Sequence, residues 1–122
     1  MQDGTRRVVV VDDDAAVRDS LAFLLEIAGY EVERFASGPE CMAALRPALV
    51  ACLVVDQHMP VMTGLEFLAA LRRQGIQLPA LLITGSPSPD LLARAAALNV
   101  RQVLSKPLVE DVFLRMVANA MH

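Results

Sequence analysis

Val8-Val9-Val10-Val11-Asp12-Asp13-Asp14 is the stretch that decides the fold of this chain, a β-branched run that ends in three carboxylates. A continuous β-branched run predicts a strand buried on both faces, which is typical of parallel sheets. Two like charges about 5 Å apart repel by roughly 1 to 3 kcal/mol at effective dielectric constants of about 80 to 20. The acidic cluster therefore indicates a cation site, and carboxylate oxygens suit a hard divalent ion.

Strand-like and helix-like patterns alternate along the rest of the chain. The expected strands are Arg7–Val11, Glu31–Phe35, Ala51–Val55, Ala80–Ile83 and Gln102–Leu104. The expected helices run from the Asp14 cap to the stop at Gly29, from Ser37 to the break at Pro47, from Leu65 to Arg73, from Pro89 to Leu98, and from Val109 to Ala120. Five strand–helix repeats predict an α/β fold with a parallel sheet between two layers of helices.

Local signals support these helix boundaries. Asp14 is a suitable N-cap, and Ser37 followed by Glu40 has the spacing of a capping box. Gly29 can end the first helix, and Asn99 can take the left-handed cap of the fourth.

The composition describes one domain with an aliphatic core. The chain has 122 residues, of which 55% are hydrophobic and only 4% are aromatic. A net charge of -3 argues against nucleic-acid binding by this segment. No apolar run is long enough to span a membrane and the N-terminus lacks a signal-peptide pattern, so we expect a cytoplasmic protein. Cys41 and Cys52 form neither a disulfide framework nor a zinc site, and Cys52 is expected in the core.

Chemically useful side chains follow four of the five expected strands. In an open parallel sheet, ligands bind outside the carboxyl ends of the strands. Any one of these residues alone would pass for a solvated loop residue, but their common placement predicts a single site. The residues are Asp12, Asp13, Asp56, Thr84 and Lys106.

Carboxylates with Mg²⁺ and a lysine indicate phosphoryl transfer, in which positioning and charge neutralisation do most of the catalysis. Mg²⁺ takes only one or two carboxylates from a protein, which leaves one aspartate free as a nucleophile. Asp56 is the candidate because it stands alone after the central strand, opposite the acidic pair. We expect Thr84 to hydrogen-bond one phosphoryl oxygen and Lys106 to pair with another.

These motifs resemble the receiver domain of two-component response regulators, and the FixJ-type subfamily in particular. The matching pieces are Val11-Asp12-Asp13, Val55-Asp56 followed by Met59-Pro60 and Gly64, Ile83-Thr84-Gly85, Lys106-Pro107 and, for the subfamily, Ser20-Leu21-Ala22-Phe23. The resemblance covers essentially the whole chain. It implies a flavodoxin-like (βα)5 fold with strand order 2-1-3-4-5, and a single receiver domain over residues 1–122 with no output domain in the chain.

The resemblance also implies roles for individual residues. Asp56 would accept a phosphoryl group from a sensor histidine kinase, and Thr84 and Lys106 would bind that group. The signal would then pass to the surface made by the fourth helix, fifth strand and fifth helix. The domain would catalyse no reaction beyond its own phosphorylation and dephosphorylation, and a cis bond is expected between Lys106 and Pro107. The implied Mg²⁺ ligands are Asp12, Asp13, Asp56 and the backbone carbonyl of His58.

Three positions depart from the family pattern. Val103 stands where receivers usually carry an aromatic ring that turns inward as the threonine moves, so we expect a switch without a ring at this position. The His58 side chain has two interpretations: its ring approaches the phosphoryl group and changes the dephosphorylation rate, or it faces solvent and only its carbonyl matters. Leu98-Asn99-Val100 replaces Ala-Gly-Ala, and Asn99 should preserve the left-handed geometry.

The fourth helix carries more apolar residues than one core face needs. They are Leu91, Leu92, Ala95 and Leu98. Either they are ordinary core residues beside a few exposed alanines, or the helix and the fifth strand form a phosphorylation-dependent homodimer surface.

Two other functions fit parts of the sequence. In a haloacid-dehalogenase-type phosphatase, Asp12-Asp13-Asp14 would supply an Asp-x-Asp motif, but the chain is short for that fold and Asp56 would have no role. The second alternative is an interaction module with a receiver fold and vestigial phosphorylation, which Val103 leaves open. A phosphodonor would label Asp12 in the phosphatase and Asp56 in a receiver.

Overall fold

The computed structural model describes residues 6–121 as a doubly wound α/β domain. Within these residues a parallel sheet has the order β2-β1-β3-β4-β5, which confirms the predicted topology. The strands are β1 (Arg7–Val11), β2 (Glu31–Phe35), β3 (Cys52–Asp56), β4 (Ala80–Thr84) and β5 (Gln102–Ser105). The helices are α1 (Ala15–Ile27), α2 (Gly38–Ala44), α3 (Gly64–Arg73), α4 (Pro89–Ala97) and α5 (Glu110–Ala120), with a 3₁₀ turn η1 (Pro47–Leu49).

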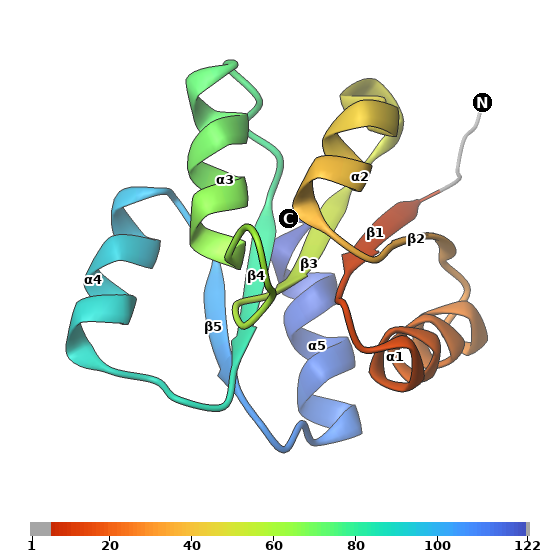
Figure 1. Ribbon diagram of the computed structural model, residues 1–122. Coiled ribbons are helices and arrows are strands. Elements are labelled where there is room, and N and C mark those ends of the chain that lie inside the picture. Colours follow the sequence, from red (N-terminus) through yellow and green to blue (C-terminus); the bar gives the residue numbers. More distant parts are fainter. Residues whose placement is uncertain (1–5, 122) are drawn as a thin grey trace.

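Two helical layers cover the sheet, with α1 and α5 on one face and α2, α3 and α4 on the other (Figure 1). The side chains of β1 alternate between them: Val9 and Val11 pack with the α2–α4 layer, and Val8 and Val10 with the α1–α5 layer. β1 is almost entirely buried, which confirms the prediction for this strand, and β3 and β4 are completely buried. The edge strand β2 is partly exposed.

The predicted helix boundaries hold with small changes. Asp14 Oδ1 accepts hydrogen bonds from the Ala16 and Val17 amides at 3.0 and 3.2 Å, so Asp14 is the cap of α1. Ser37 Oγ caps α2, but the Glu40 carboxylate accepts from the Ala36 amide, so the predicted capping box is incomplete. The helix ends at Ala44 rather than at Pro47, which instead begins the 3₁₀ turn.

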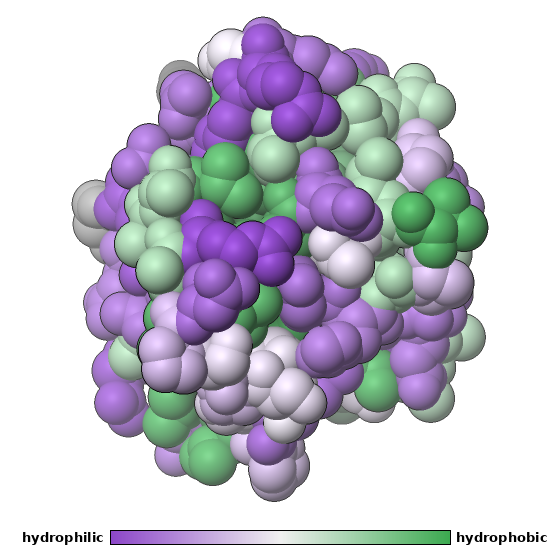
Figure 2. Space-filling model, turned by 60° about the vertical axis from the view of Figure 1, so that its left-hand side comes forward, coloured by the Kyte–Doolittle hydropathy of each residue, from purple (hydrophilic) through white to green (hydrophobic). Residues whose placement is uncertain are grey.

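The apolar residues of α4 are mostly core residues. Leu91 and Ala95 are buried and Leu98 packs against the same cluster, whereas Leu92 is 49% exposed. Figure 2, which turns the α3–α4 side forward, shows apolar residues interspersed with hydrophilic ones. This arrangement favours the interpretation of ordinary core with a few exposed alanines.

Other predictions about single residues also hold. Cys41 and Cys52 are buried free thiols, and burial raises the pKa of each to about 12. Asn99 has a φ of 58°, which confirms the left-handed cap. Among residues 6–121, no helix has the length and apolar character needed to cross a membrane.

Candidate metal and phosphoryl site

The strand register brings the predicted residues to one edge of the sheet. Val11 pairs with Val55, so the next residues, Asp12 and Asp56, emerge at the same level on neighbouring strands. Thr84 pairs with Ser105 on β5, and Lys106 follows directly. Because the strands are parallel, all these side chains lie at the carboxyl edge, where the sequence predicts a site.

Three carboxylates meet at this edge. Oxygens of Asp12, Asp13 and Asp56 lie within 4.8 Å of one another. Asp12 and Asp56 are 1% and 3% exposed, whereas Asp13 is exposed to solvent. This set has the donor atoms that a hard cation prefers.

Asp12 is buried with one of its carboxylate oxygens unpaired among the described residues. Its Oδ1 accepts a hydrogen bond from the Asp14 amide at 2.9 Å, but its buried Oδ2 has no hydrogen-bond partner among the described residues. Burial raises the pKa of Asp12 to about 6; the Asp14 amide opposes this shift, and the charge of Asp56 adds to it. Buried oxygens are normally satisfied, so the orphaned Oδ2 fits a site that takes a Mg²⁺ ion.

Lys106 reaches into the cluster from the loop after β5. Its Nζ lies 2.8 Å from Asp56 Oδ1, a buried oxygen with no hydrogen-bond donor of good geometry among the described residues. This contact raises the pKa of the ammonium group, while partial desolvation opposes the shift. The Lys106–Pro107 peptide bond is cis, as the family resemblance implies. Because its pKa is raised and its Nζ contacts Asp56, Lys106 stays charged and partly neutralises Asp56.

The hydroxyl of Thr84 is held from two sides. Thr84 is fully buried, and its Oγ1 accepts a hydrogen bond from the Ser86 amide at 3.0 Å. The Nε2 atom of His58 lies 2.9 Å from the same oxygen. The interpretation in which the His58 ring only faces solvent is therefore wrong: the residue is exposed, but one ring nitrogen is bonded to Thr84.

Three residues support the acidic cluster but were not predicted from the sequence as site residues. Buried Gln57 accepts the Leu65 amide on its Oε1 at 2.9 Å and the Gly64 amide on its backbone oxygen at 3.1 Å. Arg18 donates from Nη1 to the backbone oxygen of Asp12 at 2.8 Å. A Cβ on Gly64 would lie only 2.6 Å from the backbone oxygen of Asp56. Only Gly64 carried a signal, as part of the family motif.

Val103 stands where receivers usually carry an aromatic ring, and its side chain is part of the core packing. It is half-buried, pairs with Leu82 on β4 and packs against the core cluster beneath α4. The position is therefore used for packing.

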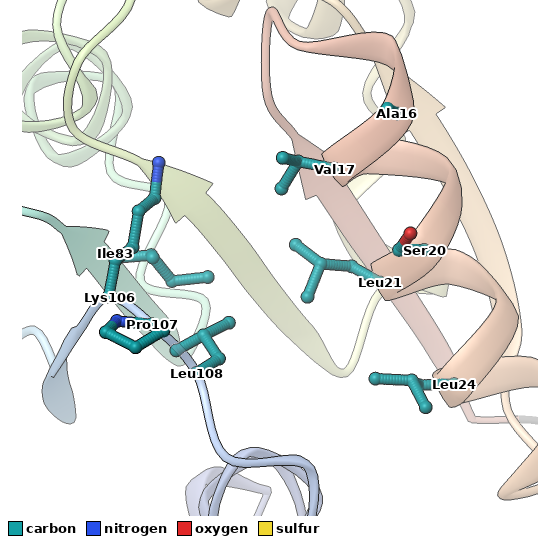
Figure 3. Close-up of a pocket in the computed structure, with 9 residues that line it drawn as sticks. All are labelled: Ala16, Val17, Ser20, Leu21, Leu24, Ile83, Lys106, Pro107 and Leu108. Atoms are coloured by element: carbon teal, nitrogen blue, oxygen red, sulfur yellow. The ribbon is translucent and has the colours of Figure 1, made fainter.

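An apolar groove of about 640 Å³ lies beside the site, between α1 and the loop after β5. Figure 3 shows Val17, Leu21 and Leu24 pointing from α1 toward Ile83 and Leu108. Lys106 and Pro107 also line it, so the groove adjoins the acidic cluster.

Residues 8–118 match the family model described as the response regulator receiver domain. The chain belongs to this family. The match excludes the haloacid-dehalogenase-type alternative, since the five-stranded order and the full-length match are those of a receiver.

Known proteins similar to this chain include a transcriptional regulator and a sensor kinase, and both are longer than this chain. The transcriptional regulatory protein FixJ of Bradyrhizobium diazoefficiens is 36% identical over 93% of this chain and 55% of its own length. The CAI-1 autoinducer sensor kinase/phosphatase CqsS of Vibrio cholerae is 33% identical over 93% of this chain and 17% of its own. The chain thus spans about half the length of the first curated relatives it matches.

Solved structures agree with the topology. The chemotaxis protein CheY4 of Vibrio cholerae has a TM-score of 0.89 and 33% identity, covering 96% of this chain and 99% of its own. The FixJ-N structure has a TM-score of 0.86 and 32% identity, covering 99% of this chain and 95% of its own. The chain is a FixJ-like receiver of two-component systems.

Proposed function

We propose that this receiver takes a phosphoryl group on Asp56 from a sensor histidine kinase, with Mg²⁺ as cofactor. The observation that carries the proposal is the pairing of a buried Asp56 with Lys106 at 2.8 Å beside the orphaned Oδ2 of Asp12. These residues place a nucleophile (Asp56), a positively charged ammonium group (Lys106) and an unpaired oxygen ligand (Asp12 Oδ2) at one edge of the sheet. The proposed metal ligands are Asp12, Asp13, Asp56 and the backbone carbonyl of His58.

The chemistry is a transfer between two nucleophiles. A carboxylate oxygen of Asp56 forms a bond to phosphorus as the bond from phosphorus to the donor histidine nitrogen breaks, and the electron pair returns to the imidazole. Bound Mg²⁺ supplies positive charge to the oxygens of the transferring group. Lys106 pairs with a phosphoryl oxygen, and the Thr84 hydroxyl donates to another. The domain performs this reaction on itself and turns over no other substrate.

The groove beside Lys106 is where we place a helix of the kinase. The exposed face of α1 has an apolar stripe at helical spacing that includes Ala16, Phe23 and Ile27, the last two 62% and 69% exposed. Such a stripe suits the apolar face of a partner helix. Because Lys106 lines the groove and contacts Asp56, a docked helix would bring its phosphohistidine close to the acidic cluster.

A second part of the proposed function concerns the surface that would pass on the signal. We expect phosphorylation to change the surface of α4, β5 and α5, and a homodimer through α4 and β5 would follow from it. Light scattering with and without a phosphodonor measures this, and an unchanged mass would remove the dimer. We also propose that residues 1–122 form one receiver domain of a cytoplasmic protein.

Labelling by acetyl phosphate tests the central proposal. We expect a phosphoryl adduct on Asp56 of the wild type that depends on Mg²⁺ and is absent from Asp56→Asn, as measured by mass spectrometry. Equal labelling of both proteins would overturn the site assignment. No labelling of the folded wild type would favour the vestigial interaction module.

A further inference from the structure

We propose that the His58 imidazole is a positioning residue that holds the Thr84 hydroxyl in the resting state and releases it when the phosphoryl group forms. The inference rests on the proposed function, since it concerns the step that follows phosphorylation of Asp56. It assigns the His58 side chain a role that is separate from its backbone carbonyl.

The hydrogen bonds of Thr84 carry the argument. Its two partners are His58 Nε2 at 2.9 Å and the Ser86 amide at 3.0 Å, and neither belongs to the acidic cluster. A hydroxyl has one proton and two lone pairs. If Nε2 accepts, it takes the proton that a phosphoryl oxygen would need; if Nε2 carries a proton, it donates and fixes the oxygen in place. In both tautomers the bond opposes movement of Thr84 toward Asp56.

The surroundings of the two residues fit a bond that can break. Thr84 is 0% exposed, so an unpaired hydroxyl there would be costly and the bond to His58 satisfies it. His58 lies on the loop between β3 and α3 and is an exposed residue, so its ring can leave the site and be solvated by water. A phosphoryl oxygen would replace the ring as the partner of Thr84.

The ring that contacts Thr84 lies on the loop after β3 and not on the neighbouring strand β5. The strand β5 (Gln102–Ser105) contains no aromatic residue: Ser105 is the residue that pairs with Thr84, and Val103 pairs with Leu82 and packs into the core under α4. The ring coupled to Thr84 in this chain therefore belongs to the loop that follows Asp56. Movement of Thr84 would be transmitted to the loop between β3 and α3 rather than to a ring on β5.

Beryllofluoride, which mimics the phosphoryl group, provides the test. Calorimetry in the presence of Mg²⁺ compares the wild type with His58→Phe, which keeps a planar ring but has no nitrogen. We expect His58→Phe to bind beryllofluoride about 3- to 10-fold more tightly, which corresponds to the loss of one competing hydrogen bond. His58→Ala, which removes the ring from an exposed position, is a second variant with the same expected direction.

A double-mutant cycle separates this role from a general effect on the loop. In a Thr84→Val background, His58→Phe should leave the affinity unchanged, because the hydroxyl that it restrains is gone. The same tightening in both backgrounds would overturn the proposal. If the wild type binds beryllofluoride and His58→Phe binds no tighter, the proposal fails while the phosphorylation site stands; if the wild type does not bind it, both fail.

The ring can also be observed directly. The sequence contains two histidines, His58 and His122, so ¹⁵N-histidine labelling gives few signals, and His58→Phe identifies those of His58. We expect the His58 ring nitrogens to move toward the shifts of a free imidazole when beryllofluoride binds. Unchanged His58 signals in a protein that binds beryllofluoride would overturn the release.

Discussion

Two adjacent regions behave in opposite ways at both β1 and β3: the apolar strand residues and the carboxylate at the carboxyl end. Their apolar segments, Val8–Val11 and Cys52–Val55, are buried and form the centre of both cores. The next residue, Asp12 directly after β1 or Asp56 at the end of β3, is just as buried but carries a carboxylate. Burial of the first region stabilises the fold, whereas burial of a carboxylate opposes it; Lys106 partly offsets this cost at Asp56, and no cation does so at the unpaired oxygen of Asp12 among the described residues. The core therefore holds the site residues in place, while the buried charge of the site lowers the stability of the fold.

Truncation of the apolar region should have the largest effect. Leu53→Ala removes a fully buried side chain from β3, and we expect a loss of about 2 to 5 kcal/mol in the free energy of unfolding. Urea denaturation measures it, with Leu49→Ala at a 49% exposed position as the control that should change little. A loss no larger than that of the control would contradict the role assigned to this region.

Neutralising the acidic end should have the opposite sign. Asp12→Asn keeps the oxygen that accepts the Asp14 amide but removes the buried charge, so we expect the metal-free protein to gain roughly 1 to 3 kcal/mol at pH 7. The variant should also lose the extra stability that Mg²⁺ gives the wild type. If Asp12→Asn is less stable than the wild type at pH 7, the buried carboxylate does not oppose folding as described above.

The same group predicts a pH dependence. The pKa of Asp12 is raised in the folded protein from 3.8 to about 6, so the folded state holds a proton that the unfolded chain has released between these values. The stability of the wild type should therefore fall as the pH rises from about 4 to 6 through this group. The advantage of Asp12→Asn should disappear near pH 4, as measured by urea denaturation across this range without Mg²⁺.

Gly64 packs closely against Asp56, where the apolar region of β3 meets the acidic one, and its substitution tests this boundary. An added Cβ would meet the backbone oxygen of Asp56 at 2.6 Å and Leu82 Cδ1 at 2.8 Å, so the backbone after β3 must shift. We expect Gly64→Ala to lose about 1 to 3 kcal/mol and to slow phosphorylation by acetyl phosphate. Gly85→Ala, where a Cβ would meet nothing within 4 Å, is the control for stability.

The smallest expected effect concerns backbone strain in the loop beside the site. Val61 has a φ of 71° and is 95% exposed, an unfavourable conformation for a β-branched residue. Val61→Asn should raise the free energy of unfolding by about 1 kcal/mol, because asparagine tolerates the left-handed region. The matched reverse variant, Asn99→Val at a φ of 58°, should lose a similar amount. Two changes of the same sign would contradict this explanation.

Local patterns in the sequence were enough for the fold and for most of the site. The strand order brings Asp12, Asp56 and Thr84 to one edge because each follows a buried strand of the same parallel sheet. Gln57 could not be recognised as a support, since a polar residue in a loop has no periodicity to mark it. The position of the His58 ring could not be predicted either, because its partner lies 26 residues away.

By itself, the sequence determined the strand–helix alternation, the caps and the identity of the groups at the strand ends. These depend on side-chain periodicity and on interactions between residues close in the chain. Only the tertiary structure decided which groups touch: the contact of Lys106 with Asp56, the bond of His58 to Thr84, and the unpaired oxygen of Asp12. The physical reason is that these contacts depend on the separation of neighbouring strands and on burial, which arise when the sheet and its two helical layers pack.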